Sequence, residues 1–264
     1  MWMSALLGVA IGTVMGLTGA GGGIFAVPAL VMVLGMEQST AGSIALLAVG
    51  AAALLGAVQG LRQGVVRYKA AMLLAVMGSV SAPPGLYLAQ LLSPQWLSLL
   101  FATVMLLVAA RMWHSAKKPT ELEISSTSKV CAISPDTGRF LWNIRTFLAL
   151  SLVGLIAGLF TGMLGVGGGF IIVPALAYLS NLRMQSIVAT SLLVIALLCA
   201  VTVGMAFSKG LQITPSIASF VVAAMVGMLV GRSLSSRIPQ AKLQQVFAVA
   251  CVAVAGLMAA RFFN

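Results

Sequence analysis

Long apolar stretches, separated by short polar turns, run through the whole chain of 264 residues. Most contain about 20 apolar residues, the length with which one α-helix crosses the hydrocarbon core of a bilayer. Short alternating strands of the kind that build a membrane barrel do not occur in the sequence. The pattern therefore predicts an all-α polytopic membrane protein. The apolar segments cover residues 4–35, 40–61, 70–92, 95–113, 146–179, 185–207, 215–236 and 240–261.

Two features interrupt this pattern. Pro83-Pro84 lies inside the stretch 70–92 and predicts a kink or an interruption there, because proline removes a helix hydrogen bond. Residues 114–145 are polar and predict a loosely ordered linker, which divides the chain into a first membrane repeat, 1–113, and a second, 146–264.

The stretches 4–35 and 146–179 are too long for one crossing. As a single helix, the 32 residues of the first would reach about 48 Å, against a hydrocarbon core of about 30 Å. Each contains a glycine cluster, at 19–23 and at 165–169. Glycine destabilises a helix interior, and lipid cannot satisfy the backbone groups that a break frees. We therefore expect each stretch to be a broken helical hairpin, enclosed by protein or facing a water-filled cavity.

The two glycine clusters are copies of one sequence, 146 residues apart and without a gap. Residues 16–30 match residues 162–176, and both copies end in Val-Pro-Ala-Leu. Broken helices at matching positions in two halves are the best sequence indication of a transporter's binding site. The sequence thus predicts two structural repeats, each made of a glycine-broken hairpin followed by three transmembrane helices.

The chain is strongly basic, with 15 Lys and Arg, 4 Asp and Glu, and a formal net charge of +11. Nucleic-acid binding would require a basic patch with interleaved aromatic residues, and the sequence has none. The enrichment of cytoplasmic loops in Lys and Arg explains the charge instead.

The same charges predict the orientation. If each long stretch crossed the membrane once, 11 basic residues would lie on one side and 4 on the other. If each stretch returns to its starting side, the division is 13 to 2, and only Lys209 and Arg261 lie opposite the rest. We therefore expect two inverted repeats, with linker 114–145 in the cytoplasm and both termini outside the cell membrane.

The cysteines give no sign of a metal or redox site. Cys131, Cys199 and Cys251 have neither paired nor metal-ligand spacing, and the last two lie in apolar helices, where packing is the expected role. The first segment lacks a basic n-region, so we expect no cleavable signal peptide. We predict no catalytic residue, metal or cofactor.

The glycine-rich motifs, one in each half and each followed by Val-Pro-Ala-Leu, resemble the sulfite exporter TauE/SafE family of permeases. The match from Gly165 to Pro174 is specific, and Val188-Ala189-Thr190-Ser191-Leu192 is similar to that family's second conserved stretch. In the first half, Ala41-Gly42-Ser43-Ile44-Ala45 retains one hydroxyl where the second half has two. The resemblance implies a bacterial inner-membrane carrier of small anions, often sulfite, sulfonates or other sulfur oxyanions.

Physical chemistry indicates how such a site would hold an anion. The helix that follows each break begins with amides that lack acceptors, and its dipole places about half a positive charge there. In an inverted-repeat fold the two breaks should approach each other near the middle of the membrane. The predicted substrate-binding residues are Gly19, Ala20, Gly21, Gly22, Gly23, Ser43, Gly165, Val166, Gly167, Gly168, Gly169, Thr190 and Ser191.

Alternatives stay open for several of these residues. The hydroxyls of Ser43, Thr190 and Ser191 would either donate to substrate oxygens or bond carbonyls of their own helix. Thr18 and Thr161 present the same choice. The glycines would serve a ligand or tight helix packing. No ionisable side chain lies deep in an apolar segment, so recognition should depend mainly on backbone dipoles and hydroxyls.

The sequence therefore predicts a secondary transporter or facilitator that exports a small anion. Uptake of a similar anion and a non-transporting assembly protein are the alternatives. An intramembrane enzyme is disfavoured because paired acids, a histidine cluster and a cysteine–histidine pair are missing from the sequence. The expected partners are the substrate anion and the bilayer. The small-residue faces would also permit a homodimer.

Overall fold

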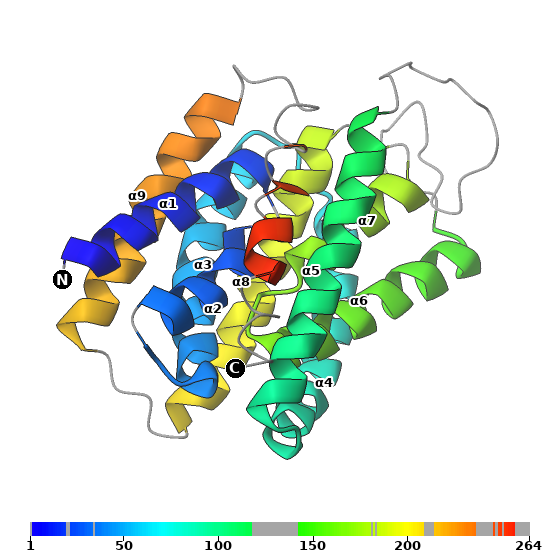
Figure 1. The fold of residues 1–264 in the computed structure, drawn as a ribbon. Coiled ribbons are helices and arrows are strands. Elements are labelled where there is room, and N and C mark those ends of the chain that lie inside the picture. Colours follow the sequence, from blue (N-terminus) through cyan, green and yellow to red (C-terminus); the bar gives the residue numbers. More distant parts are fainter. Residues whose placement is uncertain are drawn as a thin grey trace.

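The computed structural model describes residues 2–19, 22–33, 35–117, 142–180, 182, 184–208, 214–235, 245, 248–249 and 251–256. The described part is built from α-helices (Figure 1). Their bounds are α1 Trp2–Thr18, α2 Gly22–Val33, α3 Gln38–Arg62, α4 Tyr68–Leu91, α5 Pro94–Lys117, α6 Ile144–Leu164, α7 Gly169–Leu179, α8 Met184–Ser208 and α9 Pro215–Ser235. Residues 251–256 are also helical.

The all-α fold and both helix breaks are confirmed. The first long stretch is divided into α1 and α2, and the second into α6 and α7. By length and composition, the described part contains 5 helices able to cross a membrane: α3, α4, α6, α8 and α9. The helices α1, α2 and α7 are apolar but shorter, and α5 has a shorter apolar part. The predicted last segment, 240–261, and most of the predicted linker lie outside the described residues.

Of the kink or interruption expected at Pro83-Pro84, the interruption is wrong, because α4 continues through both prolines. Neighbouring helices can compensate for the lost backbone bonds in such a place. The Ser81 hydroxyl, two residues earlier, donates to the carbonyl oxygen of Leu155 in α6 at 2.7 Å. The packing against α6 therefore supports α4 where the sequence alone suggested a break.

Each broken hairpin packs on a helix of the other half. In Figure 1, α1 lies along α9, and α6 lies along α4. Gly8 of α1 faces Phe220 of α9 and Gly16 faces Met228, so these two helices run in the same direction. The contacts are backbone to backbone, which is how small residues allow membrane helices to approach closely.

The contacts of the α4–α6 seam reproduce those of the α1–α9 seam at the sequence offset of 146. Gly154 faces Leu74, Gly158 faces Gly78, and Gly162 faces Ala82. Each of these three pairs is the counterpart of a pair across α1 and α9. The repeat in the sequence is thus matched by a repeat in the packing.

The helices α3 and α8 pair in the centre of the bundle. Their membrane-length windows are 56% and 67% buried, against 39% for α4 and α9. A Cβ atom on Gly50 would lie 2.6 Å from Cβ of Cys199, and one on Gly60 would lie 2.8 Å from Cβ of Ala189. Later residues of α3 therefore meet earlier residues of α8, and the two helices are antiparallel.

Candidate substrate site at the two glycine breaks

The second break needs glycine for its backbone shape. Gly165 ends α6 with φ 69°, Gly167 has φ 80°, and Gly168 precedes α7 with φ 68°. These values lie in the left-handed region that side chains disfavour. The Gly168 carbonyl oxygen accepts from the amides of Ile171 and Ile172 at 3.0 and 3.2 Å, which starts α7. All residues from Gly165 to Gly169 are buried.

The first break has the same local form where it is described. Gly19 follows α1 with φ 71°, and its amide donates to the carbonyl oxygen of Met15 at 2.8 Å. Gly22 is the first residue of α2, and Gly23 is buried. Ala20 and Gly21, two of the predicted binding residues, lie outside the described residues.

The two breaks contact each other. A Cβ atom on Gly23 would collide with the carbonyl oxygen of Val166 in the second break. Cγ1 of Val49 would lie 3.3 Å from a Cβ atom on Gly23 and equally 3.3 Å from one on Gly167. Val49 lies near the middle of α3. The starts of α2 and α7 are thus close to one another at the middle of the central helix pair.

Each break is also anchored on the central helix of the other half. Gly19 packs against Val188 of α8. Gly165 packs against Gly42 of α3, with 2.6 Å between a Cβ placed on Gly165 and Cα of Gly42. These two contacts are equivalent at the offset of 146 residues. Gly42 and Val188 are site neighbours that sequence reasoning did not single out, although both lie in the stretches quoted around Ser43 and Thr190.

The predicted hydroxyls have partners within the protein. Ser191 is fully buried, and its Oγ donates to the carbonyl oxygen of Val188 at 2.9 Å and lies 3.3 Å from that of Gly19. Thr190 is fully buried, and its Oγ1 accepts from the backbone amide of Arg67 at 3.0 Å. Ser43 is half-buried in α3.

The threonines that precede the breaks bond their own helices. Oγ1 of Thr18 donates to the Val14 carbonyl oxygen at 2.8 Å, and Oγ1 of Thr161 donates to that of Ala157 at 2.6 Å. These are ordinary bonds of helical threonines to the preceding turn.

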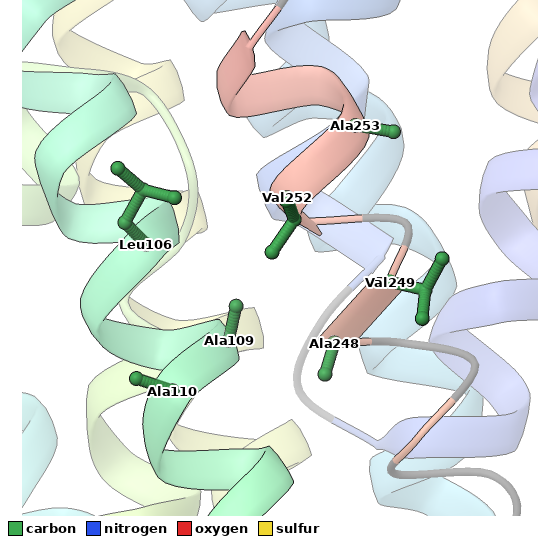
Figure 2. A pocket seen from close by; sticks show the side chains of 7 residues that line it. All are labelled: Leu106, Ala109, Ala110, Ala248, Val249, Val252 and Ala253. Atoms are coloured by element: carbon green, nitrogen blue, oxygen red, sulfur yellow. The ribbon is translucent and has the colours of Figure 1, made fainter.

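A separate apolar groove lies between α5 and the last helical segment. It encloses about 660 Å³, and Figure 2 shows Ala248 and Val252 pointing toward α5 across it. Among the described residues that line it there is no predicted binding residue and no charged or hydroxyl side chain, so this lining does not suit an anion. The residues that line it are Leu106, Ala109, Ala110, Ala248, Val249, Val252 and Ala253.

Arg67 is a residue that sequence reasoning did not single out. It is half-buried just before α4, and its Nε is buried without a hydrogen-bond partner. One signal in the sequence points to it, because a cation just before a predicted helix lies at the positive end of the helix dipole. In a loop with two other basic residues, that signal was indistinguishable from the general enrichment of cytoplasmic loops in positive charge.

In the described part of the chain, five membrane-length helices and two short helices that meet at glycine breaks form a multi-pass membrane protein, in an arrangement typical of transporters. The chain belongs to the sulfite exporter TauE/SafE family, which it matches over residues 4–258. The resemblance seen in the glycine motifs is thereby confirmed for nearly the whole chain.

Several curated relatives carry transporter names. A probable membrane transporter protein of Xylella fastidiosa (strain 9a5c) is 28% identical over 249 residues, covering 93% of this chain and 89% of the relative. The probable membrane transporter protein YunE of Bacillus subtilis is 25% identical, covering 73% of this chain and 72% of the relative. YjnA of the same organism, also a probable membrane transporter protein, is 24% identical and covers 96% of each chain.

Proposed function

We propose that this transporter is a secondary carrier or facilitator of a small anion, namely a sulfur oxyanion or organosulfonate, and that it exports the anion across the bacterial inner membrane. The observation that carries the proposal is the contact between the two breaks at Gly23 and Val166. It brings the starts of α2 and α7 together, and the dipole of each helix favours a negative charge at its start.

The packing supports the inverted arrangement of the halves. If each long stretch crossed the membrane once, α3 and α8 would run in the same direction. If each stretch returns to its starting side, the halves are inverted and the two helices are antiparallel, as the pairs Gly50–Cys199 and Gly60–Ala189 require. In the proposed orientation, which the charge distribution also supports, both termini lie in the periplasm and the α3–α4 loop lies in the cytoplasm.

The small number of acidic residues bears on what drives the proposed anion export. The chain has four Asp and Glu, and Glu37, before α3, is the one in the described part. A proton relay through buried carboxylates is therefore not part of the proposed mechanism. An inside-negative potential favours the exit of each negative charge by about 2.3 kcal/mol per 100 mV.

The test compares two glycines of equal φ. Gly168 and Gly64 both have φ 68°, so alanine must adopt a left-handed φ at both. Gly168 directly precedes α7, and a Cβ atom on it would lie 2.6 Å from Oγ1 of Thr161 in α6. A Cβ atom on Gly64 would meet nothing within 4 Å. Efflux of sulfite, thiosulfate, sulfoacetate and acetate is measured from proteoliposomes that contain equal amounts of folded protein.

We expect Gly64→Ala to transport like the wild type and Gly168→Ala to transport at least about tenfold more slowly, because a lost hydrogen bond to a charged group is worth about 1.5–3 kcal/mol. Equal rates for the two variants would contradict the assignment of the site. Absence of flux for every anion in the wild type would contradict the proposed function itself. A preference for acetate would move the substrate class from sulfur oxyanions to carboxylates.

A further inference from the structure

The guanidinium group of Arg67 contains a buried hydrogen-bond donor that no group of the described residues accepts. Its Nε is buried and has no hydrogen-bond partner. A buried donor left without a partner is destabilising, and such groups in folded proteins are usually satisfied by a water or an ion. The backbone amide of Arg67 is already used, since it donates to Oγ1 of Thr190 at 3.0 Å. The unsatisfied donor is therefore Nε of the side chain.

No acid of the described part can neutralise Arg67. Glu37, the only one there, precedes α3, whereas Arg67 follows that helix after a short loop. The 25 residues of α3 separate the two positions by about 37 Å. The start of α4 adds to the local positive potential, because Arg67 occupies the N-cap position of that helix. A bound oxyanion would neutralise the guanidinium charge and also interact favourably with the positive end of the α4 dipole.

Arg67 is joined to the first glycine break through α8. Oγ1 of Thr190 accepts a hydrogen bond from the Arg67 amide. The next residue, Ser191, lies with its Oγ 3.3 Å from the carbonyl oxygen of Gly19. The Thr190 hydroxyl accepts from Arg67 and so keeps its own proton for another acceptor. The Arg67 backbone and the buried Thr190 hydroxyl thus lie beside the part of α8 that contacts the first break.

We propose that Arg67, with the hydroxyl of Thr190, forms an oxyanion-binding site that receives the substrate on the α3–α4 side of the first break. This inference rests on the proposed function and adds a charged ligand to a site that was expected to depend mainly on backbone groups. At the offset of 146, Ile213 and Ile44 take the places of Arg67 and Thr190. The charged site therefore belongs to one side of the membrane only, which is the cytoplasmic side in the proposed orientation.

The test uses charge-matched variants of one loop. Arg67→Gln and Lys69→Gln each remove one positive charge, but Lys69 is exposed. Arg67→Lys keeps the charge and loses the guanidinium donors. Thermal stabilisation of the purified full-length protein by sulfite and by thiosulfate is titrated in neutral detergent. Efflux from proteoliposomes is then measured against the concentration of each anion on the α3–α4 side, in vesicles of phosphatidylcholine with and without phosphatidylglycerol.

We expect Arg67→Gln to raise the half-saturating anion concentration roughly tenfold to a hundredfold, because a hydrogen bond to a charged group is lost. Lys69→Gln should change it less than about threefold, and Arg67→Lys should fall between the two. The maximal rate should change less than the half-saturating concentration, which a merely structural role for Arg67 would not predict.

Each other outcome overturns the inference in a recognisable way. If Arg67→Gln and Lys69→Gln behave alike while the wild type binds and transports anions, the Arg67 site is refuted and the proposed function stands. If Arg67 alters only the dependence on phosphatidylglycerol, the oxyanion is a lipid phosphate and not the substrate. If the wild type neither binds nor transports any of these anions, the inference and the proposed function fail together.

Discussion

The glycine seams provide the sharpest test of the packing, through substitution of Gly154 and Gly158 by alanine. A Cβ atom on Gly154 would lie 2.8 Å from the carbonyl oxygen of Leu74, so α4 and α6 must separate by about half an ångström to restore an ordinary contact. A Cβ atom on Gly158 would collide with both the carbonyl oxygen and Cα of Gly78. There the separation must exceed about one ångström.

These displacements set the expected energies. If two helical turns share about twenty atom pairs at about 0.1–0.2 kcal/mol each, the local dispersion energy between the helices is about 2–4 kcal/mol. A gap of about half to one ångström loses about a quarter to a half of that energy. Rotamer and backbone strain add to this loss, so we expect about 1 kcal/mol for Gly154→Ala and about 3 kcal/mol for Gly158→Ala. At about 2–4 °C per kcal/mol, the apparent melting temperature should fall by about 2–4 °C and 6–12 °C.

The assay is thermal unfolding of the detergent-purified protein, and Gly204→Ala is the matched control. Gly204 lies inside α8, and a Cβ atom there would meet nothing within 4 Å. Alanine at that position should be neutral or stabilising by up to about 1 kcal/mol. The offset of 146 predicts that Gly12→Ala behaves like Gly158→Ala, since it faces Ala224 in the same way. Equal melting temperatures for Gly158→Ala and Gly204→Ala would refute the close seam.

Three further predictions concern the hydroxyl at α8, the orientation and the coupling. Thr190→Val leaves the Arg67 amide without its acceptor and should destabilise the protein by about 1–3 kcal/mol in thermal unfolding. Thr190→Ser keeps a hydroxyl and should retain most of that stability. Equal stability of the two variants would contradict the hydrogen bond between the Arg67 amide and Thr190 Oγ1. Trp2 and Arg62 are both exposed positions, so a cysteine at either one would be accessible from its own side of the membrane. In a background without native cysteines, a membrane-impermeant thiol reagent applied to intact cells should label Trp2→Cys and not Arg62→Cys. The reverse labelling pattern would contradict the proposed orientation. At clamped voltage, anion efflux should persist without a pH gradient, and a strict requirement for the gradient would contradict a mechanism without a carboxylate relay.

Much of the fold could be predicted because its main determinants are local. The glycine clusters at 19–23 and 165–169 specify breaks through backbone conformation, and Gly165, Gly167 and Gly168 have the left-handed φ values that such breaks need. Gly8, Gly12 and Gly16 recur every four residues, which is typical of a close helix contact. The partner of that contact was not predictable, because a small-residue face fits any other small face. Only the structure shows that α1 packs against α9 of the other half.

The remaining differences come from tertiary packing. Pro83 and Pro84 weaken a helix in isolation, but α4 is supported by α6 at Ser81 and continues. The Ser191 hydroxyl was expected either to meet substrate or to bond its own helix, and it contacts Gly19 of a distant segment as well. The importance of Arg67 depends on the burial of one nitrogen atom, which no pattern in the loop sequence specifies. The predicted ligands at the breaks stay predictions until an anion is located.

The most direct measurement of the central claim is anomalous diffraction from crystals grown with selenite, the selenium analogue of sulfite, because selenium marks the anion itself. We predict an anomalous peak between the starts of α2 and α7, within hydrogen-bonding reach of amides near Gly23 and Gly169. At selenite concentrations that stabilise the protein, a peak found only away from both breaks would contradict the claim that the two interrupted helices hold the anion.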